Sequence, residues 1–452
     1  MNRADDVTYG VLTNASVPAN WDTREVSFWD ARSGILEWAS SDHRAAGGPR
    51  PTVAVIRDLP VQPESHPKRA HLPHNVVVLS WVSFFQDAAS EMLYPVLPLF
   101  LTGVLGAPVA AVGLIEGVAE ATASAMKVLS GRLADLRRRR PMIAGGYVLS
   151  SIAKPMIGLA RAWPFVLVAR FVDRTGKGIR TSPRDALIAD EAPSHLRGRA
   201  FGFHRAADTA GAVVGPLIGL AMYEMLDHNI RPLFFIAFIP AAISVFLIAF
   251  VHEAPERPVP PVESKIAGGQ LPTRYWRVVV FLALFGLVNF SDALLILRAK
   301  ALGLGFAAVI LAYALYNLTY AGLSYPAGRV SDRVPRRVVY ATGLAIFAVA
   351  YLGLGITTTS AWVWPLFALY GGYTALTDGV GKAWVADLLP ADREGSGLGL
   401  YQGIAGAGSL VAGIWAGLAW NGTGRLPLIV SGTVVATLSI TLFATGRRLE
   451  RQ

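Results

Sequence analysis

Long apolar runs that contain ionisable residues constrain this chain more than any other feature of its sequence. A transmembrane helix needs about 20 mainly apolar residues in succession, and runs of that length recur along most of the 452 residues. They predict twelve spans, at about 76–101, 109–129, 142–160, 163–187, 199–222, 232–251, 276–297, 306–327, 338–358, 362–387, 396–420 and 426–445. The sequence therefore predicts an all-α membrane protein embedded in a lipid bilayer.

The placement of the basic residues indicates the orientation of the chain in the membrane rather than an acidic binding partner. Lys and Arg number 41 against 31 Asp and Glu, but the excess falls in alternate loops. These basic loops hold Arg132 and Arg137–Arg140, Arg197 and Arg199, Arg257–Arg277, Arg329–Arg337, and Arg447–Arg451. By the positive-inside rule this pattern places both termini in the cytoplasm and argues against a nucleic-acid partner. The absence of cysteine excludes disulfides, thiolate metal sites and thiol catalysis.

The chain contains an internal duplication. Segments 131–140 and 328–337 are related by a shift of 197 residues, and the same shift relates 188–203 to 385–400. One shift that holds over two separate regions indicates a repeated six-span unit. We expect a polar, disordered N-terminal tail over 1–75 without a signal peptide. The expected domains are a six-helix bundle at 76–251, a cytoplasmic linker at 252–275, a second bundle at 276–446 and a tail at 447–452.

Ionisable residues inside the first four spans are the first candidate site. Asp87 and Glu91 lie four apart in a proline-interrupted span, and Glu116 and Glu120 repeat this spacing in the next span. For Asp87 and Glu91 we favour a functional role, whereas for Glu116 and Glu120 we favour a structural role as partners of Lys127, Arg170 or Arg174 over a functional one. The fourth span carries a charged stripe at i, i+3, i+4 and i+7, consisting of Arg170, Asp173, Arg174 and Lys177. A stripe this charged is expected to line a cavity rather than face lipid.

The later spans add further polar candidates. His204, Arg205 and Asp208 come from the fifth span, and His204 is either a titrating group or a fixed hydrogen-bonding residue. Asn289 and Asp292 lie in the seventh span, and Asp378 in the tenth is placed to pair with Lys382. The eighth span offers an aromatic and polar face that includes Tyr313, Tyr316, Asn317 and Tyr320. Lys154 in the third span lacks a partner that the sequence can identify.

Two six-helix halves, a long central loop and a GxxxD…R[RK] turn after spans two and eight resemble the major facilitator superfamily. The resemblance covers residues 76–446. It implies a cytoplasmic gating motif in each half, formed by Gly131, Asp135 and Arg139 or Arg140, and by Gly328, Asp332 and Arg336. It associates Arg170 with proton transfer. It also associates the GxxxGPxxG pattern of Gly211, Gly215, Pro216 and Gly219 with antiporters that export solutes, although close helix packing explains the same glycines.

The expected function is proton-coupled efflux of a small solute or drug by a monomer in a bacterial inner membrane. Asp87, Glu91 and Asp208 are the residues expected to carry the proton or a cationic part of the substrate, because carboxyl groups withdrawn from water hold protons near neutral pH. Import of a siderophore, metal chelate, metal ion or organic anion is the alternative. A membrane-embedded enzyme or assembly factor is disfavoured, because no HExxH or GxSxG signature is present. No cofactor or resident metal is predicted.

Overall fold

The structure is a computed structural model that describes residues 9–10, 26–30, 35–39, 72–134, 138–193, 196–252, 271–390 and 394–449. The chain separates into two units, residues 1–71 and residues 72–452. In the first unit, β1 (Tyr9–Gly10), β2 (Val26–Asp30) and β3 (Ile35–Ala39) form an antiparallel sheet in the order β1-β2-β3. The sequence analysis did not anticipate these strands, and the rest of the expected tail up to residue 71 lies outside the described residues.

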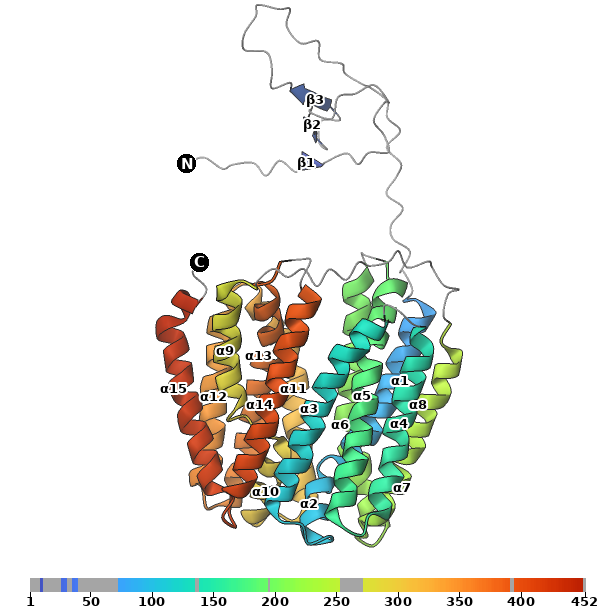
Figure 1. Ribbon diagram of the computed structural model, residues 1–452, viewed down its shortest axis with the longest axis vertical. Helices are drawn as coiled ribbons and strands as arrows, with labels where there is room; N and C mark the ends of the chain where they lie inside the picture. The colour runs from blue at the N-terminus through green and yellow to red at the C-terminus, as the bar shows by residue number, and fades with distance from the viewer. Residues whose placement is uncertain are drawn as a thin grey trace, which may run out of the picture. The chain divides into compact units, whose positions relative to one another are not determined.

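The second unit is helical and follows the twelve predicted spans (Figure 1). Its first six spans are α1 (His74–Leu93) with α2 (Val96–Gly103), α3 (Val109–Ala134), α4 (Arg139–Leu159), α5 (Trp163–Glu191), α6 (Arg197–Met225), and α7 (Arg231–Ile236) with α8 (Phe238–Leu247) and η2 (Ile248–Phe250). Its last six are α9 (Thr273–Gly286) with α10 (Asp292–Ala301), α11 (Phe306–Ser331), α12 (Arg336–Ile356), η3 (Ser360–Trp362) with α13 (Val363–Ala386), α14 (Glu394–Leu418), and α15 (Arg425–Leu449).

Within the described residues, nine of these spans are long and apolar enough to be recognised as membrane-crossing helices by composition alone. The remaining three are α5, the interrupted pair α9 and α10, and α13. The charged stripe of α5, the break between α9 and α10, and the tyrosines, glycines and charged pair of α13 each lower the apolar signal. Large apolar side chains point away from the bundle, among them Leu418, Ile440 and Phe246 at 73%, 69% and 65% exposure. Such exposure suits a lipid environment, and the chain is a multi-pass membrane protein.

The duplication detected in the sequence is present in the helix boundaries. The first residues of α3 and α11, Val109 and Phe306, are 197 positions apart, and α4 and α12 begin 197 positions apart at Arg139 and Arg336. Each of these pairs also has equal length, with 26 residues in α3 and α11 and 21 in α4 and α12. The fold is therefore two six-helix bundles built on one plan.

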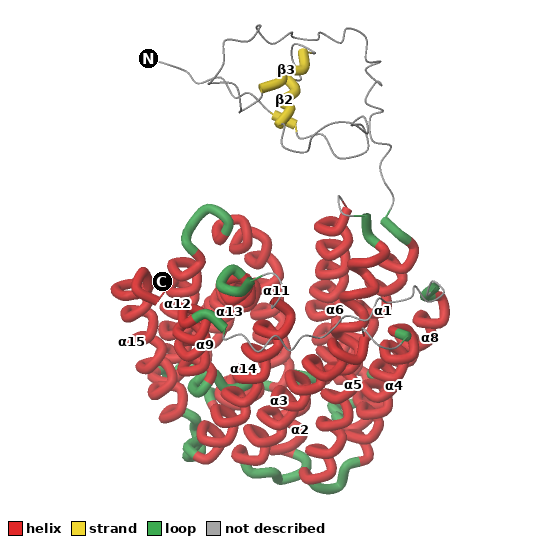
Figure 2. The backbone as a smooth tube through the Cα atoms, turned by 45° about the horizontal axis from the view of Figure 1, so that its top comes forward, coloured by secondary structure: helices red, strands yellow, loops and turns green. Residues whose placement is uncertain are grey.

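The two halves approach each other most closely where α3 lies beside α14 (Figure 2). A Cβ atom built on Gly113 would lie 2.0 Å from the carbonyl oxygen of Gly413, so only glycine permits this backbone contact. The corresponding pair on the other side, α6 and α11, stacks the rings of Tyr223 and Phe306 at 3.9 Å. The halves thus touch along two helix pairs that the duplication relates to each other.

The first span of each half is broken at an equivalent place. Pro95 has no N–H to donate to the Glu91 carbonyl, which separates α1 from α2. In the second half, Ser291 caps α10 by accepting a bond from Ala293 N at 3.3 Å. The two breaks meet between the halves, where the hydroxyl oxygens of Tyr94 and Ser291 are 3.0 Å apart. These two residues are themselves 197 positions apart.

Candidate functional site

A chain of buried charges joins α3 to α5 inside the first half. Arg170 holds both carboxylate oxygens of Glu116 through its Nη2, at 2.7 and 2.9 Å, and Nη1 donates to Asp173 Oδ2 at 3.1 Å. Arg174 continues the chain to Glu120 at 3.3 Å and to Asp173 at 3.9 Å. Negative and positive side chains alternate along this network, because two acids spaced i, i+4 on α3 face two arginines spaced i, i+4 on α5. The interpretation of Glu116 and Glu120 as partners of the basic residues therefore agrees with the geometry.

Lys154 of α4 supplies the positive charge that this network of buried charges lacks. The network of buried charges contains three carboxylates and two guanidinium groups. Among these carboxylates, Asp173 attracts Lys154 most strongly. The Lys154 ammonium is buried, at 4% exposure, and donates to Ser150 O at 3.2 Å and Ser90 Oγ at 3.4 Å. The lysine that the sequence left without a partner is thus placed to neutralise the network.

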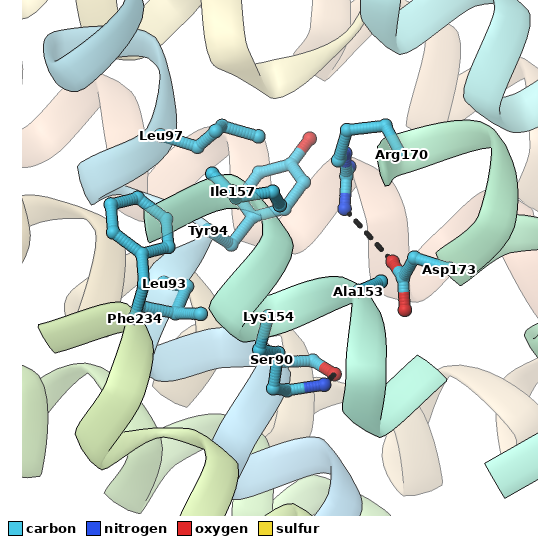
Figure 3. A pocket seen from close by; sticks show the side chains of 10 residues that line it. All are labelled: Ser90, Leu93, Tyr94, Leu97, Ala153, Lys154, Ile157, Arg170, Asp173 and Phe234. Carbon is cyan, nitrogen blue, oxygen red and sulfur yellow. Dashed lines mark hydrogen bonds and ion pairs between the residues drawn. The ribbon is translucent and has the colours of Figure 1, made fainter. Parts of the chain in front are cut away.

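A small cavity lies beside Lys154, between α1, α4, α5 and α7 (Figure 3). One wall is polar and the other is apolar. The lining residues are Ser90, Tyr94, Lys154, Arg170 and Asp173 on the polar side, and Leu93, Leu97, Ala153, Ile157 and Phe234 on the apolar side. Because all ten residues belong to the first six spans, this cavity is enclosed within one half.

The two acids of α1 have different surroundings. Glu91 accepts a 2.7 Å hydrogen bond from Tyr313 Oη of α11 and so links the two halves. Among the described residues, Asp87 has neither a hydrogen bond nor an ion pair within 4 Å, although Lys177, Arg180 and Arg184 act on it electrostatically from α5 and Asp208 from α6. Asp87 is therefore a partly buried carboxylate without a direct cationic partner.

The glycine pattern of α6 packs directly on the stretch of α1 that carries Asp87. A Cβ on Gly211 would lie 2.5 Å from Phe84 O and 3.2 Å from the Asp87 Cβ. A Cβ on Gly215 would lie 2.5 Å from Ala88 O. These contacts agree with the close-packing interpretation of the pattern, and they hold Asp87 against α6.

The polar residues at the start of α6 reach in two directions. His204 is buried, and its Nε2 lies 3.8 Å from Asp208 Oδ2, while neither ring nitrogen forms a hydrogen bond within the described part of the chain. Arg205 points toward the second half, where it contacts the Tyr320 hydroxyl and lies 3.7 Å from Asp378 Oδ2. Asp378 also pairs with Lys382 at 2.7 Å, as the i, i+4 spacing predicted.

Several of these charged side chains remain exposed at the interface between the halves. Arg205 is 59% exposed and Asp378 37%, although they face each other across the two halves, and Glu120 of α3 is 46% exposed. A charge at the centre of a bilayer costs about 2.5–3.5 kcal/mol on insertion scales, so charges on spanning helices normally face water or a partner. The exposed charges therefore indicate a water-accessible passage between the bundles.

In the second half, tyrosines hold the polar groups. Tyr370 Oη donates to Asp292 Oδ1 at 2.6 Å, and Asn289 Nδ2 donates to Tyr373 Oη at 3.1 Å. The structure brings Asp292 and Asn289 to α13 but does not group Asp87, Glu91 and Asp292 into a metal-binding cluster within the described residues. Tyr370 and Tyr373 were not among the residues predicted from the sequence, although their i, i+3 spacing in the span that carries Asp378 was a signal available there.

The sequence analysis also missed two arginines that continue the α5 stripe. Arg180 donates to Ser150 Oγ at 2.6 Å and lies 4.3 Å above the Tyr147 ring. Arg184 donates to Ser83 Oγ of α1 at 2.9 Å. Both follow Lys177 at helical spacing, and that continuation was a signal available in the sequence.

Comparison with known proteins identifies this architecture. The chain matches the sequence profile of the Major Facilitator Superfamily over residues 79–291 and 278–451. An uncharacterized MFS-type transporter of Methanocaldococcus jannaschii is 33% identical over 375 residues, which cover 81% of this chain and 94% of that protein. The chain belongs to the major facilitator superfamily.

More distant members of the superfamily include named resistance proteins. The multidrug resistance protein MdtH of Edwardsiella ictaluri is 23% identical over 71% of this chain and 80% of its own length. The quinolone resistance protein NorA of Staphylococcus aureus is 25% identical over 54% of this chain and 58% of its own length. Among solved structures, a bacterial homolog of the lysosomal transporter Spinster has a TM-score of 0.66 at 16% identity, over 82% of this chain and 96% of that one. At that identity the likeness concerns the fold.

The turn that resembles the superfamily's gating motif forms the same ion pair in both halves. Arg139 Nη1 lies 2.6 Å from Asp190 Oδ2, and Arg336 Nε lies 3.0 Å from Asp387 Oδ2. Gly131 and Gly328 lie near the ends of α3 and α11, and Asp332 follows α11 as its C-cap residue. Asp135 lies outside the described residues. Asp190 lies in the same half as Arg139, and Asp387 lies in the same half as Arg336. The arginines of the two turns therefore form ion pairs within their own halves.

Proposed function

We propose that this protein is a proton-coupled antiporter that exports a small solute by alternating access of its two halves to the two sides of the membrane. The observation that carries the proposal is Asp87, a partly buried carboxylate on a spanning helix that has no ion-pair partner among the described residues. A proton is the partner that such a group takes up and releases without rearranging a salt bridge.

The route of the proton follows from the surroundings of Asp87. Asp208 lies on α6, which packs against α1 at Gly211 and Gly215, and it is an electrostatic neighbour of Asp87. Glu91 stands one turn further along α1 and contacts the second half through Tyr313. Protonation of these carboxylates changes the charge at the interface between the bundles, and this change biases which side is open.

Export is the favoured direction. NorA and MdtH are resistance proteins by name, and the GxxxGPxxG pattern of α6 is shared with exporters of the superfamily. The protein then works as a monomer in a bacterial inner membrane with both termini in the cytoplasm.

The second candidate is import of an anionic solute, such as a siderophore, a metal chelate or an organic anion. It is favoured by Lys177, which forms no ion pair among the described residues, together with Arg180 and Arg184 on the same helix. The two candidates differ in the direction of solute movement relative to the proton gradient.

Transport in proteoliposomes with an imposed pH gradient tests the proposal. We expect solute movement opposite to the proton flux, its collapse on addition of an uncoupler, and loss of gradient-driven transport in Asp87→Asn. Glu224→Gln is the matched control, because Glu224 is a half-exposed carboxylate whose ion pair among the described residues is with His228. Full gradient-driven transport by Asp87→Asn would remove this residue from the mechanism, and movement of solute together with protons would replace export by import.

A further inference from the structure

Several acids on the spanning helices differ in the partners of their carboxylates. Glu116, Asp173 and Asp378 each pair with an arginine or lysine of the protein. Glu91 and Asp292 form no ion pair with a basic residue within the described ranges, and each is capped by the hydroxyl of a tyrosine, Tyr313 at 2.7 Å and Tyr370 at 2.6 Å. No basic side chain of the described residues therefore neutralises either carboxylate within ion-pair distance.

A continuous row of aromatic rings connects these two acids. Ring centroids are 5.6 Å apart between Tyr313 and Tyr316 and 5.2 Å apart between Tyr316 and Tyr370. Tyr94 of the first half stacks on Tyr313 at 5.4 Å. We call Tyr94, Tyr313, Tyr316 and Tyr370 the tyrosine cluster. Tyr94 directly follows α1 of the first half, whereas Tyr313 and Tyr316 belong to α11 and Tyr370 to α13 of the second half. The cluster is therefore complete only when the halves meet.

The position next to the cluster holds a hydrogen-bond donor for which the described residues offer no acceptor. Asn317 follows Tyr313 by four residues, so the two lie on one side of α11. Its side chain is buried, with 7% exposure, and its Nδ2 has no acceptor among the described residues. An amide donor without an acceptor is costly in a buried place and is commonly explained by a ligand or water.

We propose that the tyrosine cluster, with Glu91 and Asp292 at its two ends, binds the positively charged group of an organic cation, an amine or a quaternary ammonium or phosphonium. Aromatic faces attract such a cation through their quadrupoles, and the attraction is stronger away from water. The carboxylates supply the countercharge once the tyrosine hydroxyls turn away. Asn317 then donates to an oxygen or nitrogen acceptor elsewhere on the same molecule. This inference names the substrate class of the proposed transporter and rests on that function only for the role of binding in transport.

Equilibrium binding to the purified full-length protein, without any gradient, tests the inference separately from transport. The probes are tetraphenylphosphonium and tetraphenylborate, which share size and shape and carry opposite charges. We expect saturable binding of tetraphenylphosphonium and none of tetraphenylborate. Glu91→Gln and Asp292→Asn each weaken the binding by about tenfold or more, which corresponds to the loss of one charge contact of about 1.4 kcal/mol.

Two substitutions at Tyr370 separate binding from folding. Tyr370→Phe keeps the ring and frees Asp292 from the hydroxyl, so affinity for tetraphenylphosphonium stays equal or rises. Tyr370→Leu removes the ring and weakens binding by about three- to tenfold, as expected for a desolvated cation–π contact. Tyr275→Phe is the control, because this tyrosine of α9 lies outside the cluster and its hydroxyl donates to Gly397 O at 2.8 Å.

The outcomes are distinct. Equal binding of the two probes, or unchanged tetraphenylphosphonium affinity in Glu91→Gln and Asp292→Asn, overturns the inference and leaves proton-coupled export untouched. Cation binding with the expected variant pattern, in a protein that shows no gradient-driven transport, supports the inference and counts against the proposed function instead.

Discussion

Equivalent positions of the two halves carry charges in one half and aromatic rings in the other. A shift of 197 residues takes Glu116 to Tyr313, Asp173 to Tyr370 and Lys154 to Tyr351. In the first half these positions belong to a network of ion pairs, and in the second half to stacked rings, with Tyr351 and Tyr370 at 5.8 Å. Equivalent buried positions of the two repeats are therefore occupied by charged side chains in the first half and by tyrosine rings in the second half.

The difference shows how each half meets the cost of burying polar groups. An ion pair in a low-dielectric interior must be complete, because removal of one partner leaves an uncompensated charge. A tyrosine buries its ring as an apolar group and needs only one hydrogen bond for its hydroxyl. The first half is thus sensitive to single substitutions, and the second half leaves carboxylates such as Asp292 without a cation.

The largest expected effect tests this contrast at one pair of equivalent positions. Glu116→Gln removes one of the two acids that pair with Arg170, at a place where Glu116 is only 2% exposed, and leaves the network with one uncompensated positive charge. It should cost about 3–5 kcal/mol of stability. Tyr313→Phe removes a single hydrogen bond to Glu91 and should cost about 1.5–3 kcal/mol. Unfolding in detergent measures both, and equal costs would break the comparison.

A double substitution examines whether Lys154 balances the charge of the network. Lys154→Met should destabilise the protein, and adding Asp173→Asn should recover part of the loss, with a coupling energy of about 0.5–3 kcal/mol. The equivalent change in the second half, Tyr351→Phe, should have little effect because no charge is involved. Strict additivity of the two first-half substitutions would show that Lys154 does not compensate Asp173.

Substitutions at equivalent positions of α6 and α14 should have an intermediate effect on stability. Gly215→Ala forces a Cβ to within 2.5 Å of the Ala88 carbonyl oxygen and should cost about 1–3 kcal/mol. The equivalent residue of the second half is Ala412, which already accommodates a Cβ in a fully buried place. Ala412→Gly should therefore cost about 1 kcal/mol, mainly from backbone entropy. If Gly215→Ala is tolerated as well as Ala412→Gly, α1 and α6 are not fixed by this contact.

The smallest expected effect is one in which the halves should agree. Arg139–Asp190 and Arg336–Asp387 are equivalent pairs whose acids are 64% and 55% exposed. Asp190→Asn and Asp387→Asn should each cost about 0.2–1 kcal/mol, and about 1 M salt should reduce both costs. Unfolding midpoints at low and high salt check this, and a large cost for only one pair would show that the two turns have diverged in role.

Local patterns in the sequence were sufficient for the helices, the duplication and the charged stripe of α5. Apolar runs set the spans, and the i, i+4 spacings of Glu116 with Glu120 and of Arg170 with Arg174 determine which faces meet. Asp378 and Lys382 could be paired for the same reason. Each of these features depends on residues within one or two neighbouring helices.

Contacts between the halves could not be predicted from the sequence. The bond from Tyr313 to Glu91 joins residues 222 positions apart, and no local pattern specifies such a partner. The place of Lys154 depends on how α4 packs against α1 and α5, which is a tertiary property. The strands at 9–10, 26–30 and 35–39 were missed because runs of two to five residues are too short to establish an alternating pattern. The roles assigned to the site residues therefore remain predictions.

The contact between Tyr94 and Ser291 has a geometric consequence. The two bundles are related by pseudo-two-fold symmetry, and because Tyr94 and Ser291 are equivalent residues, their contact lies close to the symmetry axis. A molecule held there sees nearly the same main-chain framework from both sides. The two sides differ in the phenol ring of Tyr94 and the smaller hydroxyl group of Ser291. The orientation in which a molecule binds at this point is therefore determined by these two side chains.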